Sequence, residues 1–154
     1  IDNFALKLKA KGVTYDAAKS GALGPGGKIY NGTFMGEKAT FMVFFNTKSR
    51  IVFGVAVELS YSSVELARVP FTNIAEQLLK KYPKAVYGAN KDSNGDTNGL
   101  TFSIPNEADT EKIGVIIQTL NNSQSLLEDD CTIRLSYTDV ENFKKSEAIN
   151  NEDL

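Results

Sequence analysis

The sequence has no histidine and only one cysteine among its 154 residues. Without histidine the chain has no imidazole to act as a general base near neutral pH, to activate a nucleophile, or to bind zinc in the usual way. The single cysteine, Cys131, excludes an internal disulfide. We interpret Cys131 as a small buried hydrophobic residue at the start of a strand rather than as a nucleophile, because no histidine is there to activate it. These absences predict a protein that is not an enzyme and holds no cofactor.

A strong charge of one sign and a long apolar run are also absent. The formal net charge is −2 and the basic residues are scattered. This is a poor electrostatic match for a phosphate backbone, so we expect no nucleic-acid partner. No apolar run approaches the ~18 residues that cross a bilayer, so we expect no membrane span. The composition that is present, 42% hydrophobic and 23% charged residues, is typical of a globular domain.

The spacing of the apolar residues predicts a mixed α+β fold. Apolar residues recur at helical spacing around Phe4 and Phe71, and Pro70 suits the first position of the second of these helices. Because the connections between strands are short, neighbouring strands are expected to be antiparallel. The predicted helices cover residues 1–11, 70–82 and 139–149, and the predicted strands cover residues 13–17, 28–35, 39–45, 50–60, 85–89, 100–104, 113–120 and 132–137.

Two halves of the chain resemble each other. The pattern Asn-Phe-Ala…Leu at residues 3–8 matches Asn-Ile-Ala…Leu at residues 73–78, and Leu-Ser-Tyr at residues 59–61 recurs at residues 135–137. The alternative is a coincidental match between two amphipathic helices. We predict one domain, residues 1–154, made of a pseudo-repeat of residues 1–61 and 70–138 and a C-terminal helix and tail, residues 139–154.

The strands at residues 39–45 and 50–60 are hydrophobic on both faces. Successive side chains of a strand point to opposite faces, so if one face packs on a helix, the other carries Met42, Phe44 and Ala56. An exposed apolar sheet face is a good surface for a protein partner. These three residues are therefore the candidate binding site. The alternative is that loops or a partner subunit cover this face.

A polar segment between two predicted strands has the spacing of a calcium loop. Asn90, Asp92, Asn94 and Asp96 alternate, and a glycine occupies the sixth place. Calcium needs six to eight oxygen ligands, which such spacing helps to present. The twelfth place, however, lacks the usual glutamate. Asparagine and glycine are also typical of hairpin turns, so we prefer an ordinary hairpin loop and keep calcium as the alternative.

The remaining acidic residues leave a second function open. Carboxylates are clustered at residues 107–111 and 128–130, and Tyr61 and Tyr137 close two predicted strands. Carboxylates that meet in a pocket, together with tyrosines, are typical of small-ligand-binding proteins and of hydrolases. The leading prediction is a non-enzymatic protein-interaction module, and this small-ligand-binding protein or hydrolase is the alternative.

Short motifs along most of the chain resemble a group of uncharacterised secreted gut-bacterial proteins. They are Ile1-Asp2, Phe4 and Leu8-Lys9-Ala10-Lys11-Gly12, then Gly32-Thr33-Phe34-Met35-Gly36, then Leu79-Lys80-Lys81-Tyr82-Pro83, and finally Leu135-Ser136-Tyr137-Thr138-Asp139 with Asn142. The resemblance implies a β-lactamase-inhibitor-protein-like fold (BLIP-like, PepSY-like), with tandem helix-plus-antiparallel-sheet units and the helices on one face. It also implies a secreted or periplasmic protein, or one at the cell surface, with no known enzymatic activity.

Overall fold

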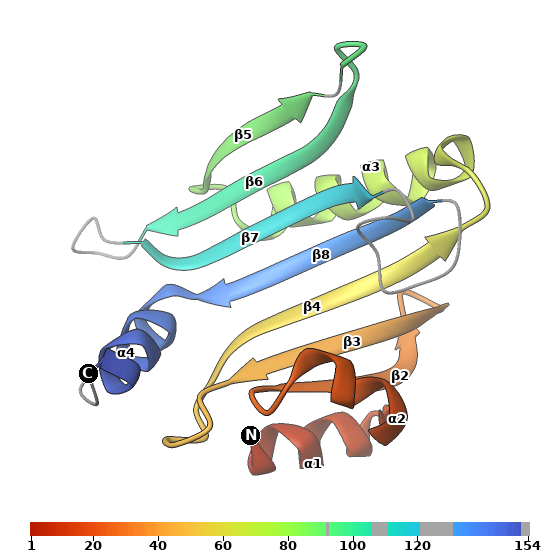
Figure 1. Cartoon of the computed structure of the whole chain (residues 1–154). Helices are drawn as coiled ribbons and strands as arrows, with labels where there is room; N and C mark the ends of the chain where they lie inside the picture. The colour runs from red at the N-terminus through yellow and green to blue at the C-terminus, as the bar shows by residue number, and fades with distance from the viewer. Residues whose placement is uncertain (92, 106–110, 121–130, 152–154) are drawn as a thin grey trace. The chain divides into compact units, whose positions relative to one another are not determined.

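The computed structural model describes residues 1–91, 93–105, 111–120 and 131–151 (Figure 1). Its helices are α1 (Asp2–Ala10), α2 (Ala17–Ser20), the 3₁₀ helix η1 (Gly21–Leu23), α3 (Val64–Lys81) and α4 (Val140–Asn151). Its strands are β1 (Thr14–Asp16), β2 (Gly27–Phe34), β3 (Glu37–Phe45), β4 (Val52–Tyr61), β5 (Val86–Lys91), β6 (Thr97–Pro105), β7 (Glu111–Leu120) and β8 (Cys131–Asp139).

The strands form an antiparallel sheet in the order β1-β2-β3-β4-β8-β7-β6-β5. This confirms the predicted α+β class, and each predicted strand overlaps an observed one. The order places β1 and β5 at the two ends, where a strand has a neighbour on one side only. The BLIP-like arrangement and the pseudo-repeat stay predictions.

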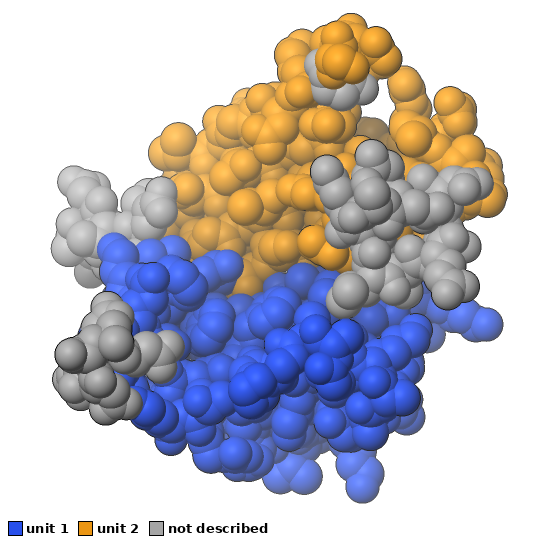
Figure 2. Space-filling view, in the orientation of Figure 1, with its two compact units in different colours: residues 1–57, 138–154 blue, residues 58–137 orange. Residues whose placement is uncertain are grey.

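The chain divides into two compact units (Figure 2). Unit 1 comprises Ile1–Val57 and Thr138–Leu154, and unit 2 comprises Glu58–Tyr137. The helix predicted to follow the second half, α4, belongs to unit 1. Strands β4 and β8 pass from one unit into the other, so neither unit is a simple half of the sequence.

Helix α3 begins at Val64, six residues before the predicted start at Pro70, so that prediction is wrong. The side chain of Ser63 caps the helix, because its Oγ accepts a hydrogen bond from the amide of Leu66 at 3.3 Å. Pro70 therefore lies inside the helix, where it removes a backbone donor. The helix continues through it because its inner face is anchored by packing, and the residues buried on that face are Ala67, Phe71, Ile74 and Ala75.

The prediction of an open apolar face at Met42, Phe44 and Ala56 is wrong. Met42 and Ala56 are only 2% and 4% exposed, and they form a buried cluster with Ile29. Leu23 of η1 and the half-buried Phe44 pack against this cluster. The 3₁₀ helix η1 therefore covers part of this face in unit 1 with the side chain of Leu23. A partner could reach Met42 and Ala56 only after η1 had moved.

A hydrogen bond from the backbone of β2 fixes the end of α2, which leads directly into η1. The amide of Ile29 donates to the Oγ of Ser20 at 2.8 Å, and that hydroxyl donates to the carbonyl of Asp16 at 2.6 Å. The carboxylate of Asp16 also accepts from the amide of Lys19 at 3.0 Å, which caps α2. Both ends of α2 are therefore fixed by hydrogen bonds, and its last residue is tied to β2.

In unit 2, α3 contacts β7, and the core residues come from the helix and the central strands (Figure 1). Phe102 of β6 is opposite Val115 of β7 in the strand register, and both side chains are fully buried. Ile117 and Ile133 are fully buried too. One face of these strands thus forms the core beneath α3, as the alternation of apolar residues predicts.

Asn46, which follows β3 in unit 1, is a buried polar residue whose side chain makes hydrogen bonds through both its oxygen and its nitrogen. Its Oδ1 accepts from the amides of Lys48 and Ser49 at 2.9 and 2.8 Å. Its Nδ2 donates to the Oγ and carbonyl oxygen of Ser146 in α4 at 3.1 and 3.3 Å. One side chain therefore shapes the β3–β4 turn and attaches α4 to it.

Replacing Asn46 by alanine is expected to lower the free energy of unfolding by about 2–3 kcal/mol, because buried groups lose their partners. Urea denaturation followed by far-UV circular dichroism measures the change. Thr47→Ala, at the exposed neighbouring position, is the matched control and should change stability by less than about 0.5 kcal/mol. Equal effects of the two substitutions would show that the Asn46 side chain does not organise the turn.

Candidate functional site

Strand β5 in unit 2 is the most exposed strand that the structure describes. Every one of its six residues is exposed, and it stands at the end of the strand order, paired with β6 alone (Figure 1). Val86 and Tyr87 are 70% and 61% exposed although both have large apolar side chains. An edge strand presents unpaired backbone N–H and C=O groups, to which another extended chain can bind.

The register with β6 fixes how β5 lies in the sheet. Val86 is opposite Ser103, and the pairing continues regularly to Asn90 opposite Gly99, after which the register shifts. The ring of Tyr87 lies 6.1 Å from that of the buried Phe102, so one side of this exposed tyrosine rests on the core. The residues from 86 to 90 therefore form a regular, supported edge rather than a frayed one.

The segment that includes this edge is basic. Residues 80–91 contain four lysines and no acidic residue, within a chain of net charge −2. The lysines are Lys80, Lys81, Lys84 and Lys91, and all four are exposed. Between Lys84 and Lys91, the edge itself carries no charged side chain. The segment thus combines an uncharged row of backbone groups with three lysines before it, and it ends at Lys91, which Asp92 follows in the sequence.

Local chemistry explains this arrangement. Lys80 and Lys81 occupy the last turn of α3, where a positive charge interacts favourably with the helix dipole. Tyr82 caps the end of the helix, since its amide donates to the carbonyl of Leu78 at 2.9 Å. The amide of Ala85 then donates to the carbonyl of Tyr82 at 3.0 Å. A tight turn around a proline therefore leads directly from the basic helix end into β5.

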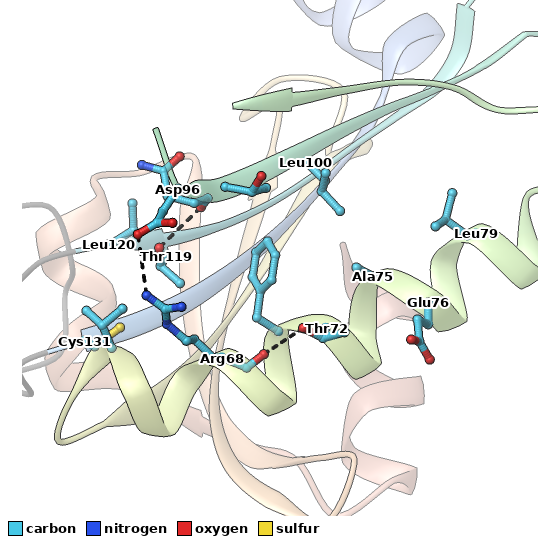
Figure 3. Close-up of a pocket in the computed structure, with 14 residues that line it drawn as sticks. Arg68, Thr72, Ala75, Glu76, Leu79, Asp96, Leu100, Thr119, Leu120 and Cys131 are labelled. Atoms are coloured by element: carbon cyan, nitrogen blue, oxygen red, sulfur yellow. Dashed lines mark hydrogen bonds and ion pairs between the residues drawn. The ribbon is translucent and has the colours of Figure 1, made fainter. Parts of the chain in front are cut away.

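Unit 2 also has a pocket of about 750 Å³ between α3 and strands β6 and β7 (Figure 3). Arg68 extends from α3 toward Asp96 of the β5–β6 turn, and the Nη2–Oδ2 distance is 3.7 Å. Glu76 lies at the opposite end of the pocket from Asp96.

Cys131 also lines this pocket, and it is buried, as its interpretation as a small hydrophobic residue requires. Burial raises the pKa of the Cys131 thiol, and the negative charge of Glu65 raises it further. Since the thiolate is the nucleophilic form, a raised pKa keeps the side chain unreactive at neutral pH.

The loop predicted as a hairpin is confirmed as one, since β5 and β6 are antiparallel and Gly95 has a φ of 85°. Asn90 pairs within the ladder. The Nζ of Lys91 donates to the carbonyl of Gly95 at 3.2 Å, so a positive charge already lies inside the turn. Asp96 is paired with Arg68.

Calcium binding at Asn90, Asp92, Asn94 and Asp96 stays a prediction. Asp92 lies outside the described residues. Among the residues that the structure does describe, no group of three His, Cys, Asp or Glu side chains could hold a metal ion. Asn94 takes part in another interaction in the structure.

The residues of the alternative function lie mostly outside the described part of the chain. Residues 107–110 and 128–130 belong to undescribed segments. Tyr61 and Tyr137 are half-buried and have partners of their own. The structure therefore does not test whether these carboxylates and tyrosines meet.

Sequence reasoning missed Val86, Tyr87 and the lysines beside them. The run without acidic residues is visible in the sequence, but the position of β5 at the end of the sheet is not, because it depends on the strand order. Ordinary strand alternation gave no reason to distinguish residues 85–89 from the other predicted strands.

No family model matches the chain, and no curated protein or solved structure matches it either. The resemblance to secreted gut-bacterial proteins therefore stays a prediction. Of the helices in the described residues, none combines the length and apolar character needed to cross a membrane.

Proposed function

We propose that this chain is a non-enzymatic binding module that captures an extended, acidic polypeptide segment along the edge of β5. The observation that carries the proposal is the combination of six exposed residues of β5 at a sheet edge with three lysines, Lys80, Lys81 and Lys84, that precede it in a run without acidic residues. In strand addition, backbone hydrogen bonds supply affinity and alternate side chains supply specificity. Val86 and Tyr87 offer apolar contacts on the two faces of the added strand.

Charge favours a different acidic chain over a second copy of this one. Pairing β5 with β5 of another copy would bring two lysine-rich segments together, and like charges across an interface are costly. An acidic strand gains attraction from Lys80, Lys81 and Lys84, which precede the edge. The other edge strand, β1, has only three residues and includes Asp16, so it offers a poorer template for an acidic strand.

A polypeptide also fits this edge better than a nucleic acid does. Single-stranded nucleic acids need a positively charged groove with aromatic rings on which successive bases stack. The uncharged stretch between Lys84 and Lys91 presents backbone groups and one exposed ring, that of Tyr87. The backbone groups are complementary to another peptide backbone.

Binding is tested with an acetylated, amidated peptide of about ten residues in which glutamate alternates with valine or threonine, a length that matches an ordinary strand. The same peptide with glutamine for glutamate is the ligand control. We expect the acidic peptide to bind more tightly and to weaken as salt is added, because salt screens exposed charges. Tighter binding of a single-stranded oligonucleotide, or dimerisation through β5 in sedimentation, would contradict the proposal.

The triple variant Lys80→Glu/Lys81→Glu/Lys84→Glu is expected to weaken peptide binding by about 10-fold or more, from three exposed charge contacts. The matched control is Lys7→Glu/Lys144→Glu/Lys145→Glu, which makes the same charge change at exposed positions of α1 and α4. Calorimetric titration gives both affinities. Equal losses in the two variants would mean that only net charge matters and that β5 is not the site.

Proline substitutions in β5 test the contribution of its backbone hydrogen bonds to peptide binding without changing any charge. Successive N–H groups of an edge strand point alternately toward the neighbouring strand and outward. Of Gly88→Pro and Ala89→Pro, one therefore breaks the β5–β6 ladder and lowers stability, and the other removes only an outward donor. We expect the stable variant to bind the acidic peptide clearly less well, and unchanged binding by it would contradict strand addition.

The location and the catalytic inactivity of the protein are proposed on other grounds. A secreted or periplasmic location is supported by the resemblance of the sequence motifs to secreted gut-bacterial proteins. The absence of histidine and the raised pKa of Cys131 support a role without catalysis. Fractionation of the native cells with an antibody against the chain tests the location.

A further inference from the structure

A second concave surface lies in unit 1, between α1 and strands β1 and β2, with a volume of about 660 Å³. We refer to it as the α1 groove. It is within the size range of small-molecule sites in proteins. Its lining residues are Asp2, Ala5, Leu6, Lys9, Val13, Thr14, Tyr15, Lys28 and Tyr30. None of them belongs to β5 or to unit 2, so the groove is independent of the proposed peptide edge.

The walls of the groove are largely apolar. Val13 and Tyr30 are buried, whereas Leu6 and Tyr15 are exposed although both have large apolar side chains. The rings of Tyr15 and Tyr30 pack at a centroid distance of 5.4 Å and an angle of 57°. Two aromatic rings and an exposed leucine that face one hollow favour an apolar acyl chain or ring as the occupant.

The charges at the rim favour an anion. The ammonium group of Lys28 lies 5.6 Å from the ring centre of Tyr15 and 5.8 Å from that of Phe45, which is within cation–π range. Lys9 of α1 is a second cationic residue of the lining. Burial raises the pKa of Tyr30, with smaller contributions from Tyr15 and Asp2, so its phenol adds no negative charge at neutral pH.

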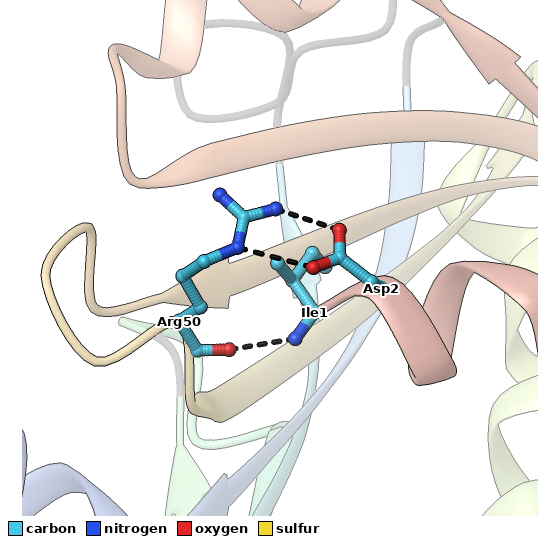
Figure 4. A network of polar contacts seen from close by, with 3 residues as sticks. All are labelled: Ile1, Asp2 and Arg50. Carbon is cyan, nitrogen blue, oxygen red and sulfur yellow. Dashed lines mark hydrogen bonds and ion pairs between the residues drawn. The ribbon is translucent and has the colours of Figure 1, made fainter.

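Asp2 is the only acidic residue of the lining, and Arg50 already compensates its charge (Figure 4). The Nε and Nη2 of Arg50 donate to the two carboxylate oxygens at 3.1 and 2.6 Å. The hydrogen bond from Arg50 holds the pKa of Asp2 below its usual value. Since that carboxylate is matched by a guanidinium of its own, the two lysines leave the groove with positive charge.

We propose that the α1 groove binds a small amphiphilic carboxylate, with its acyl or aromatic body between Leu6, Tyr15 and Tyr30 and its carboxylate near Lys9 and Lys28. Apolar walls alone would accept a neutral molecule equally well. The two lysines select the anion, and the Arg50–Asp2 pair prevents Asp2 from repelling it. The ligand is a soluble small molecule rather than a membrane surface, because the apolar lining is confined to a few residues of the segments around α1, β1 and β2 and is not a broad face.

Decanoate, below its micelle concentration, is the probe, and decanol is the neutral comparison. The chain has six tyrosines and no tryptophan, so tyrosine fluorescence and calorimetric titration both report binding. We expect decanoate to bind about 5-fold more tightly than decanol, from the exposed charge contacts. Equal affinity for the two compounds, or binding only to anionic vesicles, would overturn the proposal.

Variants locate the site. Lys9→Met/Lys28→Met is expected to weaken decanoate binding by about 10-fold while leaving decanol binding unchanged. Lys7→Met, on the same helix but outside the groove lining, is the matched control. Ala5→Phe should fill the hollow and abolish binding of both compounds. Melting temperatures check that each variant folds, and wild-type affinity in folded Ala5→Phe would show that the ligand binds elsewhere.

Discussion

Replacing Glu58 by alanine is expected to lower the free energy of unfolding by about 3–5 kcal/mol, because it removes the buried carboxylate of an ion pair. Glu58 lies on β4 in unit 2, and its side chain is 0% exposed. Its Oε1 accepts a hydrogen bond from the Nε of Arg134 on β8 at 2.7 Å and another from the Nη2 of the same residue. The Arg134 side chain is 25% exposed, so solvent only partly compensates the loss.

The double variant Glu58→Leu/Arg134→Met shows whether the ion pair itself stabilises the sheet or whether only the loss of one of its two charges is costly. Removing both charges also removes their cost of desolvation, so the double variant is expected to be close to wild type in stability. Denaturation in urea measures the double variant and both single variants, and Glu76→Ala, at an exposed acidic position of α3, is the control. If the double variant lost as much stability as the two single variants together, the pair would stabilise the sheet in its own right.

Replacing Gly27 by alanine is expected to cost about 3 kcal/mol through overpacking. A Cβ at this position would lie 2.4 Å from the Cβ of Leu23 and 3.3 Å from its carbonyl oxygen. Neither atom is at the flexible end of a side chain, so η1 itself would have to move. This displacement would open the apolar cluster that Leu23 covers.

A strand glycine without close neighbours is the matched control for Gly27. A Cβ added to Gly114 in β7 would meet nothing within 4 Å, so Gly114→Ala should be neutral or stabilising by up to about 1 kcal/mol. The variant Leu23→Gly/Gly27→Ala removes the clash and should show a favourable coupling in a double-mutant cycle. Additive losses at the two positions would mean that the contact between them is not the cause.

The elements that the sequence predicts well are those whose apolar pattern is local. Alternation in β8 and the stripe of Phe71 and Ile74 in α3 are visible within one short window. The start of α3 could not be placed in this way, because Pro70 is a strong local signal and the packing that overrides it is tertiary. Whether the face at Met42 is open or covered by a loop could not be decided from the sequence for a similar reason, since Leu23 meets Met42 only after β2 and β3 have paired.

The ion pair of Glu58 and Arg134 joins two positions that are equivalent in the predicted pseudo-repeat. Glu58 precedes one Leu-Ser-Tyr motif and Arg134 precedes the other, 76 residues later. The pseudo-repeat itself stays a prediction. Which charges would meet could not be predicted from the sequence, because the register of β4 and β8 depends on the whole sheet.

The candidate site was predictable only in part. The run of lysines from residue 80 to residue 91 is a property of the sequence. The run is part of a candidate binding site because β5 lies at the edge of the sheet and exposes Val86 and Tyr87, and this edge position depends on the strand order. In the same way, the α1 groove depends on Tyr15 and Tyr30 being placed side by side by the pairing of β1 and β2.

Amide hydrogen exchange with and without the acidic peptide tests the capture of a strand by β5 most directly. An added strand pairs with the outward N–H groups of the edge, so these amides must exchange more slowly in the complex. We expect protection to increase within residues 86–90 and not in β1, the other edge of the sheet. Unchanged exchange in β5 at saturating peptide, or protection gained at β1 instead, would contradict the proposed function.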